Sequence, residues 1–228
     1  MRRSLTRSSR SVNGRYCNRY EYEGAEVDVC DSALTAVLLA ELFADEGLEP
    51  AEKEALFPAM VLADPGAALA AIGAESFWDM LAAVSWDAFG LDLLGEHRGE
   101  AEEPVFDWAE DAGRIRASLL QAYGLSWDEA APRTSYADMC DLLAGLMESG
   151  ETPLQQAVLY RTAEPPRETK YNRELVEAFR ARREHYRLRR EASPADTAEA
   201  ANDAMASAFM GEWAAAERAA GKGAAHGR

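Results

Sequence analysis

The stretch Asp107–Leu125, DWAEDAGRIRASLLQAYGL, decides the fold, because it is the most regular piece of the chain. Its apolar side chains recur at steps of three and four residues and share one helical stripe, which comprises Trp108, Ala112, Ile115, Leu119 and Tyr123. Asp107, with Glu110 three positions later, predicts the start of a helix, and Gly124 predicts its end. Burial of each large apolar side chain stabilises the fold by about 1.5–3 kcal/mol, far more than a surface ion pair does. We therefore interpret this helix as an element of packing that carries no residue for chemistry.

Other elements are predicted from their caps and their apolar spacing. Residues 20–29 alternate apolar and acidic side chains around Glu23-Gly24, which indicates a short β-hairpin. Helix starts are indicated at Asp31, Pro50, Asp64-Pro65, Ser135 and Thr152-Pro153. The side chains expected to face inward are Leu34, Val37, Leu38 and Leu42 in the first helix, Leu56 and Met60 in the second, and Trp78, Trp86 and Trp108 farther along. The chain is thus predicted to be mainly α, a compact helical domain with a small N-terminal β-hairpin, a basic C-terminal helix and a flexible tail.

Composition divides the 228-residue chain into three predicted segments. Residues 1–19 are an Arg- and Ser-rich basic arm that we expect to be disordered, although a mitochondrial transit peptide would share this composition. Residues 20–165 are expected to form the helical domain, which ends at Pro165-Pro166. Residues 166–228 hold the basic helix and an Ala-rich C-terminal extension. In this last segment the candidate partner contacts are Phe179, Tyr186 and Trp213.

The formal net charge of −16 is unevenly distributed. Residues 21–166 carry 30 acids against six bases, whereas residues 167–191 carry nine bases against five acids. The acidic segment 21–166 repels phosphate backbones, so nucleic acid is not an expected partner. A contact of nucleic acid with the basic helix 167–191 is the minor alternative. The longest apolar runs fall far short of the roughly 20 residues that a membrane-spanning helix requires, so no membrane association is expected.

The residues that could carry chemistry are few and scattered. Cys17, Cys30 and Cys140 are an odd number of thiols without a CxxC pair, which favours buried thiols in a reducing compartment. The three histidines lie far apart in the sequence, each among polar or charged residues, and are interpreted as surface residues. The adjacent acids Glu102-Glu103 and Glu110-Asp111 are interpreted as solvated side chains. Because no phosphate-binding loop or other enzyme motif occurs, we expect a non-enzymatic protein without catalytic, cofactor-binding or metal-binding residues.

The opening stretch and its surroundings resemble a bacteriophage family, the gene-product-fifteen family of siphophage tail proteins. The family's central motif is an aromatic-Asp-aromatic triplet, an acid pair, an Ile, a small pair and a Tyr-Gly-hydrophobic end. The corresponding residues are Phe106-Asp107-Trp108, Glu110-Asp111, Ile115, Ala117-Ser118 and Tyr123-Gly124-Leu125. The upstream segments EYEGAEVDVCDSALTAVLLAELF and LFPAMVLADPGAAL, the helix 136–147 and Tyr160-Arg161 are also similar, so the resemblance spans about residues 20–165. The motif positions, with a structural role expected, are Asp107, Trp108, Ile115, Leu119, Tyr123 and Gly124.

The resemblance implies a tail assembly chaperone. Such proteins coat the tape measure protein, a very long helical chain with exposed apolar surface, until tail tube subunits polymerise around it. The implied partners are therefore the tape measure protein and the tail tube protein. Self-association is a separate hypothesis, in which the basic helix 167–191 docks against an acidic neighbouring copy or an acidic client segment. The implied location is the host cytoplasm during phage assembly, with absence from the mature virion. The alternative is a structural virion protein of the tail or head–tail junction, which purified particles would contain at a fixed copy number.

Overall fold

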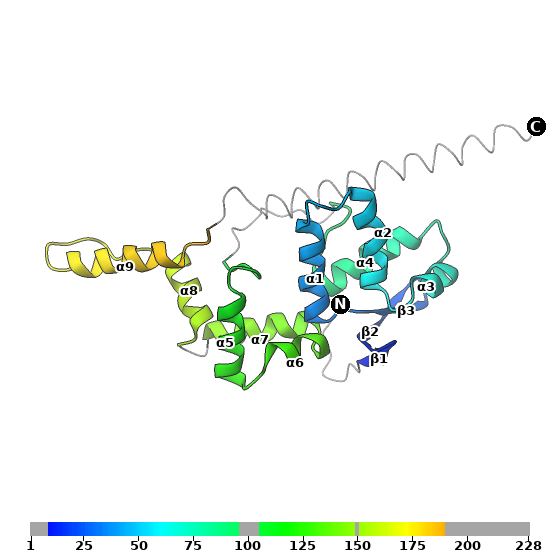
Figure 1. Ribbon diagram of the computed structural model, residues 1–228, viewed down its shortest axis with the longest axis horizontal. Coiled ribbons are helices and arrows are strands. Elements are labelled where there is room, and N and C mark those ends of the chain that lie inside the picture. The colour runs from blue at the N-terminus through cyan, green and yellow to red at the C-terminus, as the bar shows by residue number, and fades with distance from the viewer. Residues whose placement is uncertain (1–8, 96–104, 149–150, 190–228) are drawn as a thin grey trace, which may run out of the picture. The chain divides into compact units, whose positions relative to one another are not determined.

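The computed structural model describes residues 9–95, 105–148 and 151–189, and the chain forms two compact units (Figure 1). Of the described residues, 9–95 belong to the first unit and the rest to the second. This division differs from the single domain predicted over 20–165, because the helices on either side of residues 96–104 bury separate sets of apolar side chains. The start of the predicted arm and the Ala-rich extension from residue 190 lie outside the described residues.

A three-stranded antiparallel sheet opens the first unit. Strands β1 (Arg10–Val12), β2 (Arg15–Tyr22) and β3 (Ala25–Val29) lie in that order. The predicted turn at Glu23-Gly24 is confirmed, and its φ angles of 49° and 84° suit a two-residue hairpin loop. Asn13-Gly14 makes a second such turn, with φ angles of 52° and 78°. Residues 10–19 were expected to belong to the disordered arm, but this turn pairs them into strands.

Four helices follow the sheet in the first unit. They are α1 (Ala33–Ala44), α2 (Pro50–Val61), α3 (Pro65–Ile72) and α4 (Phe77–Phe89). Helix α1 packs on α2, and α3 packs on α4, while α3 also contacts β3 and α4 contacts β2. The starts predicted at Pro50 and Asp64-Pro65 are confirmed, and the Asp64 carboxylate accepts the Ala67 N–H at 2.8 Å. The cap of α1 is Ser32 and not Asp31, because Asp31 is buried beside the sheet.

The predicted inward face of α2 is displaced by one residue, and that of α1 is confirmed among its leucines only at Leu42. Helix α1 buries Leu39 and Phe43 and leaves Leu34 and Leu38 exposed, and α2 buries Phe57 and Val61 and leaves Leu56 exposed. Phe43 and Phe57 stack with ring centroids 5.8 Å apart, so the two largest side chains set the rotation of both helices. One residue turns a helix by about 100°, which moves the neighbouring leucines towards solvent. Trp86 was also expected in the core, but 38% of it is exposed.

The chain that leaves α2 joins the free edge of the sheet. The Cys30 N–H donates to the Val61 carbonyl at 2.7 Å, and the Ala63 N–H donates to the Asp28 carbonyl at 3.0 Å. Arg15 on β2 donates to the carbonyls of Ala59 at 2.7 Å and Leu62 at 3.2 Å, and also to that of Met60. A helix C-terminus leaves carbonyls without intrahelical partners and carries partial negative charge, so this guanidinium stabilises the end of α2.

Two buried polar groups lie where β2 meets the end of β3. The Asp31 carboxylate, 2% exposed, accepts hydrogen bonds from the Asn18 amide at 2.8 and 3.0 Å and from the Tyr20 hydroxyl at 2.8 Å. Beside it, the Cys17 and Cys30 Sγ atoms lie 2.9 Å apart, both buried as free thiols. Burial and then the hydrogen bond with Cys17 raise the pKa of Cys30 to about 12. Both thiols are buried as expected, while Cys140 is half-buried.

The second unit is helical throughout its described residues. Its elements are α5 (Ala112–Tyr123), α6 (Trp127–Ala130), the 3₁₀ turn η1 (Ala131–Arg133), α7 (Tyr136–Glu148), α8 (Pro153–Thr162) and α9 (Arg173–Tyr186). Helix α5 packs on α6, α7 and α8, and α9 packs on α8 (Figure 1). The basic helix therefore belongs to this unit and not to a separate extension. The side chains that close the core are Ile115, Leu119, Met139, Leu143, Leu146, Leu154 and Val176.

The fold is mainly α with a small N-terminal antiparallel sheet, as predicted. The helix starts expected at Ser135 and Thr152-Pro153 are confirmed by hydrogen bonds from the Asp138 and Gln155 amides to the two hydroxyls. No single helix within the described ranges has both the length and the apolarity to cross a membrane; α3 and α4 pass that test only as a pair, bent by 119°.

Candidate functional site

The opening stretch forms a capped turn followed by a helix. Asp107 accepts the N–H groups of Ala109 and Glu110, both at 2.8 Å, and so caps the turn over residues 108–111. The cap of helix α5 is Asp111 and the helix begins at Ala112, so it starts four residues later than the pattern predicted. Gly124 ends it as predicted, with a left-handed φ of 67°.

The motif residues of α5 and its turn are spread between the core and the surface. Ile115 and Leu119 are fully buried. Tyr123 is 38% exposed, and its hydroxyl donates to the Leu142 carbonyl at 3.0 Å. Trp108 is half-buried in an aromatic cluster, in which its ring lies 5.1, 6.0 and 6.3 Å from those of Phe106, Trp127 and Tyr136. These contacts join the turn to α6 and α7 and give the motif a packing role.

Asp111 was expected to be solvated, but it is completely buried. It accepts two hydrogen bonds from the Arg161 guanidinium, at 2.6 and 2.9 Å, and one from Arg114 at 2.7 Å. Burial by itself would raise the pKa of Asp111, but the hydrogen bonds from Arg161, the Asp107 backbone and Arg114 outweigh it and lower the pKa. The carboxylate is therefore held ionised inside the second unit.

Arg161 connects four parts of the second unit. Besides Asp111, its guanidinium donates to the Val105 carbonyl at 3.0 Å and to the Tyr186 carbonyl at 2.5 Å. Its side chain is only 9% exposed. A planar guanidinium has five N–H donors in a fixed fork, which suits several acceptors at once. Arg161 thus fixes the last turn of α9 against α8 and the start of α5.

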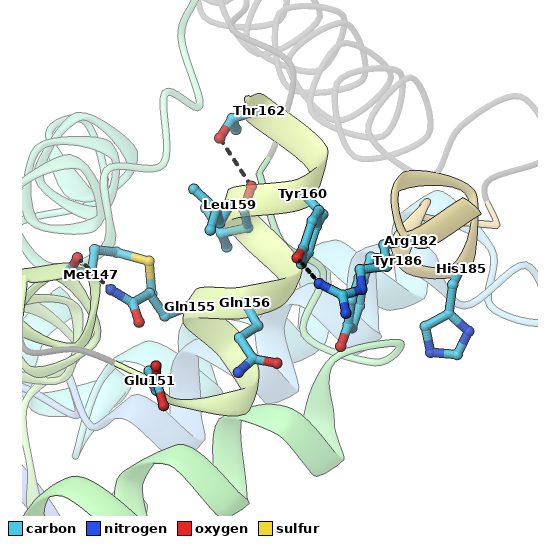
Figure 2. A pocket seen from close by; sticks show the side chains of 11 residues that line it. Met147, Glu151, Gln155, Gln156, Leu159, Tyr160, Thr162, Arg182, His185 and Tyr186 are labelled. Atoms are coloured by element: carbon cyan, nitrogen blue, oxygen red, sulfur yellow. Dashed lines mark hydrogen bonds between the residues drawn. The ribbon is translucent and has the colours of Figure 1, made fainter. Parts of the chain in front are cut away.

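A groove crosses α8 next to this ion pair, and Figure 2 shows its lining. It has a volume of about 730 Å³, within the usual range of about 300–1,000 Å³ for binding sites. On one side of α8 lie Met147, Gln155 and Leu159, and on the other side Tyr160 faces Arg182 of α9 (Figure 2). Leu159 is 54% exposed, so it offers apolar surface to the groove. We call this set of residues the α8–α9 groove.

Aromatic rings form one wall of the α8–α9 groove. Tyr160 stacks on Tyr186 with a centroid distance of 5.6 Å and an interplanar angle of 5°, and it also contacts Phe179 in a T-shaped arrangement at 5.3 Å. The Arg182 guanidinium donates to the Tyr160 hydroxyl at 2.5 Å and lies 5.5 Å from its ring centroid. The wall is therefore a packed cluster of three aromatic rings with the Arg182 cation against one of them.

Two of the three candidate partner contacts are brought together by this wall. Phe179 and Tyr186 are half-buried and pack against Tyr160, so part of each ring surface is used for packing within the second unit. Trp213 lies outside the described residues. Sequence reasoning missed Asp111 and Arg161, although Asp111 precedes Ile115 by one helical turn and so falls on the buried stripe. The resemblance had already singled out Tyr160-Arg161, but without a role.

Within the described ranges there is no cluster of three or more His, Cys, Asp or Glu side chains that could hold a metal ion. His185, which lines the α8–α9 groove, is exposed and contacts the edge of Tyr186 at 4.9 Å. The lining thus combines apolar and aromatic side chains with the Arg182 cation, the Glu151 carboxylate and the neutral polar side chains of Gln155, Gln156 and Thr162. Comparison of the chain with protein-family models, with curated proteins and with solved structures finds no match in any of the three.

Proposed function

We propose that the protein is a bacteriophage tail assembly chaperone that binds helical segments of a tape measure protein in its α8–α9 groove. The observation that carries the proposal is the exposed Leu159 on one side of α8, with the Tyr160–Arg182 pair on the other side of the same helix. The motif resemblance over residues 20–165 supports the class of protein, and this groove supports the mode of binding. A role without catalysis is part of the proposal.

The groove chemistry suits an amphipathic helix as client. Recognition of this kind places an apolar stripe in a hydrophobic groove through side chains one and two turns apart. Leu159 and Tyr160 would contact the stripe, and Arg182 would meet a carboxylate beside it. Complete burial of one leucine contributes about 1.5–3 kcal/mol, so a single groove gives only modest affinity. Many copies along one client would hold it firmly and still release it stepwise.

The negative charge of residues 21–166 also suits a protein that coats a client in many copies. Residues 21–166 carry 30 acids against six bases, so copies held along one client repel each other and the coated complex stays soluble. Tail tube subunits would then displace the copies one by one. In this proposal the protein acts in the host cytoplasm and is absent from the finished particle.

Co-expression with the tape measure protein of the same phage tests the binding step. The full chain should keep the client in the soluble fraction and co-purify with it. The double variant Leu159→Ser, Arg182→Glu should reduce the co-purified client about tenfold, which corresponds to roughly 1.4 kcal/mol. The matched control is Leu120→Ser, because Leu120 is 60% exposed on α5 and does not line the groove. Equal client solubility with and without the chain would contradict the proposal.

Mass spectrometry of purified phage particles separates the proposal from its alternative. A chaperone should be missing from the particles, whereas a structural protein of the tail or head–tail junction should appear at a fixed copy number. Detection at such a number would favour the structural role.

A further inference from the structure

Cys17 and Cys30 face each other across the β2–β3 ladder of the first unit. Asn18 pairs with Val29, so the next pair along the ladder joins Cys17 of β2 to Cys30, the residue after β3. The Cys30 N–H donates to the Val61 carbonyl at 2.7 Å, at the edge of β3 that faces away from β2. Because the hydrogen bonds of an antiparallel pair alternate along the ladder, Cys17 and Cys30 form a non-hydrogen-bonded pair, the kind in which the two side chains lie closest.

The distances suit a bond between the two sulfurs. The Sγ atoms lie 2.9 Å apart, and both cysteines are free thiols. A disulfide requires an S–S separation of about 2.05 Å and Cα atoms about 4.4–6.8 Å apart, and a non-hydrogen-bonded pair brings its Cα atoms to about 4.5 Å. A small rotation of the two side chains, without a change of strand register, is therefore enough to close the bond.

The backbone on both sides of the thiol pair is held in place. The Arg15 guanidinium, two residues before Cys17 on β2, donates to two carbonyls at the end of α2, at 2.7 and 3.2 Å. Cys30 is tied to the same segment through the Val61 carbonyl. Both thiols are buried, with 0% of Cys17 and 1% of Cys30 exposed. The folded unit thus holds the two thiols in mutual contact, which favours a bond within the pair.

We propose that Cys17 and Cys30 are a redox modification site, which a low-molecular-weight disulfide of the glutathione type converts into a cross-strand disulfide. In the first step one cysteine thiolate attacks the small disulfide, so that a mixed disulfide forms and one small thiolate leaves. The second cysteine thiolate then attacks the sulfur of its neighbour, and the other small thiolate leaves. The cysteine pair loses two electrons and two protons, and the small disulfide is reduced to two thiols. Because no client takes part, this chemistry is independent of the proposed function.

Burial makes the reaction slow in the folded chain. The thiolate is the reacting form, and burial, followed by the hydrogen bond with Cys17, raises the pKa of Cys30 to about 12. The oxidant can reach the pair only when the sheet opens locally, and a reductant meets the same barrier once the bond has formed. Brief exposure to an oxidant should therefore leave the thiols reduced, whereas prolonged exposure should produce a disulfide that persists.

Peptide mapping after incubation of the full chain with oxidised glutathione tests the bond. The variant Cys140→Ser, whose change lies in the second unit, leaves only Cys17 and Cys30 and serves as the parent chain. After prolonged incubation under native conditions, the mass of the parent should fall by two hydrogen atoms. Trypsin should then yield residues 16–19 joined to residues 20–53. The control Cys17→Ala in the same background can form no such product.

Amide hydrogen exchange measures whether the bond suits the fold. A disulfide that matches the native geometry reduces the freedom of the open state, so exchange in β2 and β3 should slow about ten- to hundredfold in the oxidised parent. Dithiothreitol should reverse the change, and helices α5 to α9 should exchange at the same rate in both states. The same treatment should leave the exchange rates of the Cys17→Ala control unchanged.

Three outcomes would overturn the proposal. Thiols that stay reduced after prolonged incubation, or glutathione adducts without the joined peptides, would show that the pair does not close. Joined peptides from two different chains, identified with a mixture of ¹⁵N-labelled and unlabelled protein, would show a bond between copies. Unchanged or faster exchange in β2 and β3 after oxidation would show that the bond does not match the native sheet.

Discussion

The two units each contain a buried aspartate, and the two carboxylates join different elements: β2 to the end of β3 in the first unit, and α5 to α8 in the second. In the first unit Asp31 accepts hydrogen bonds from the neutral Asn18 amide and Tyr20 hydroxyl. In the second unit Asp111 accepts from the guanidinium groups of Arg161 and Arg114. Hydrogen bonds to neutral donors lock a local strand geometry, whereas the charged pair holds helices distant in sequence. The comparison shows that a buried carboxylate orders neighbouring strands in the first unit and joins helices distant in sequence in the second.

The largest expected loss of stability comes from removal of the buried Asp111 carboxylate. Asp111→Ala leaves Arg161 and Arg114 without their buried counter-charge, and loss of one partner of a buried pair costs about 3–5 kcal/mol. Urea denaturation should show this loss, and hydrogen exchange should place it in α5, α8 and α9. The control is Asp128→Ala, since its ion pair with Arg116 is exposed and should not affect stability measurably. A loss equal to that of the control would show that Asp111 does not organise the second unit.

Removal of the Asp31 carboxylate should destabilise the protein less than removal of the Asp111 carboxylate. Asp31→Ala removes an acceptor from the Asn18 amide and the Tyr20 hydroxyl, and an unsatisfied buried donor costs about 1–3 kcal/mol. Hydrogen exchange should increase in β2 and β3 and stay unchanged in α5 to α9. Glu41→Ala, an exposed change in the same unit, serves as the control. If both units lose protection together, the two aspartates do not act separately.

Loss of one hydrogen bond between uncharged groups in the second unit should have a smaller effect on stability than either aspartate substitution. The buried Ser118 hydroxyl accepts the Leu154 N–H at 3.0 Å, in the first turn of α8. Ser118→Ala should reduce the free energy of unfolding by about 1 kcal/mol, because that amide then lacks its acceptor. Ser126→Ala is a matched control, since the Ser126 side chain makes no capping hydrogen bond at the start of α6. Equal unfolding midpoints for the two variants would contradict the assignment.

The pH dependence should be the smallest effect under ordinary conditions. The folded state lowers the pKa of Asp111, so its contribution is complete above the unfolded value of about 3.9 and is lost as the pH falls through the folded pKa. The second unit should therefore keep its stability from neutral pH down to about pH 4 and lose it below. Asp111→Asn should flatten this acid limb. An unchanged acid limb in that variant would assign the pH dependence to other carboxylates.

Local chemistry made much of the fold predictable. Caps and turn residues located the hairpin at Glu23-Gly24 and the helix starts at Pro50, Asp64-Pro65 and Thr152-Pro153, because these signals act within a few residues. Asn13-Gly14 is an equally strong hairpin signal, and its recognition would have extended the sheet to Arg10.

What could not be predicted depends on contacts between distant elements. The burial of Leu39 and Phe43 in α1 and the one-residue displacement of the α2 face follow from the Phe43–Phe57 stack, which no periodicity within either helix reveals. Asp111 is 50 residues from Arg161, so its burial depends on a partner that local pattern does not identify. The α8–α9 groove likewise arises from packing between helices whose individual sequences are only weakly apolar.

The position of Arg161 has a consequence for synthesis on the ribosome. Its guanidinium needs the Tyr186 carbonyl, which is made 25 residues later, as well as Asp111, which is made 50 residues earlier. In a nascent chain that ends with α8, the Tyr186 carbonyl is not yet available to the Arg161 guanidinium. This guanidinium must then be buried without one of its acceptors, or α8 must stay undocked from α5. The second unit should therefore mature late in translation, only after the last turn of α9 has emerged, and premature termination before that point should yield a chain prone to degradation.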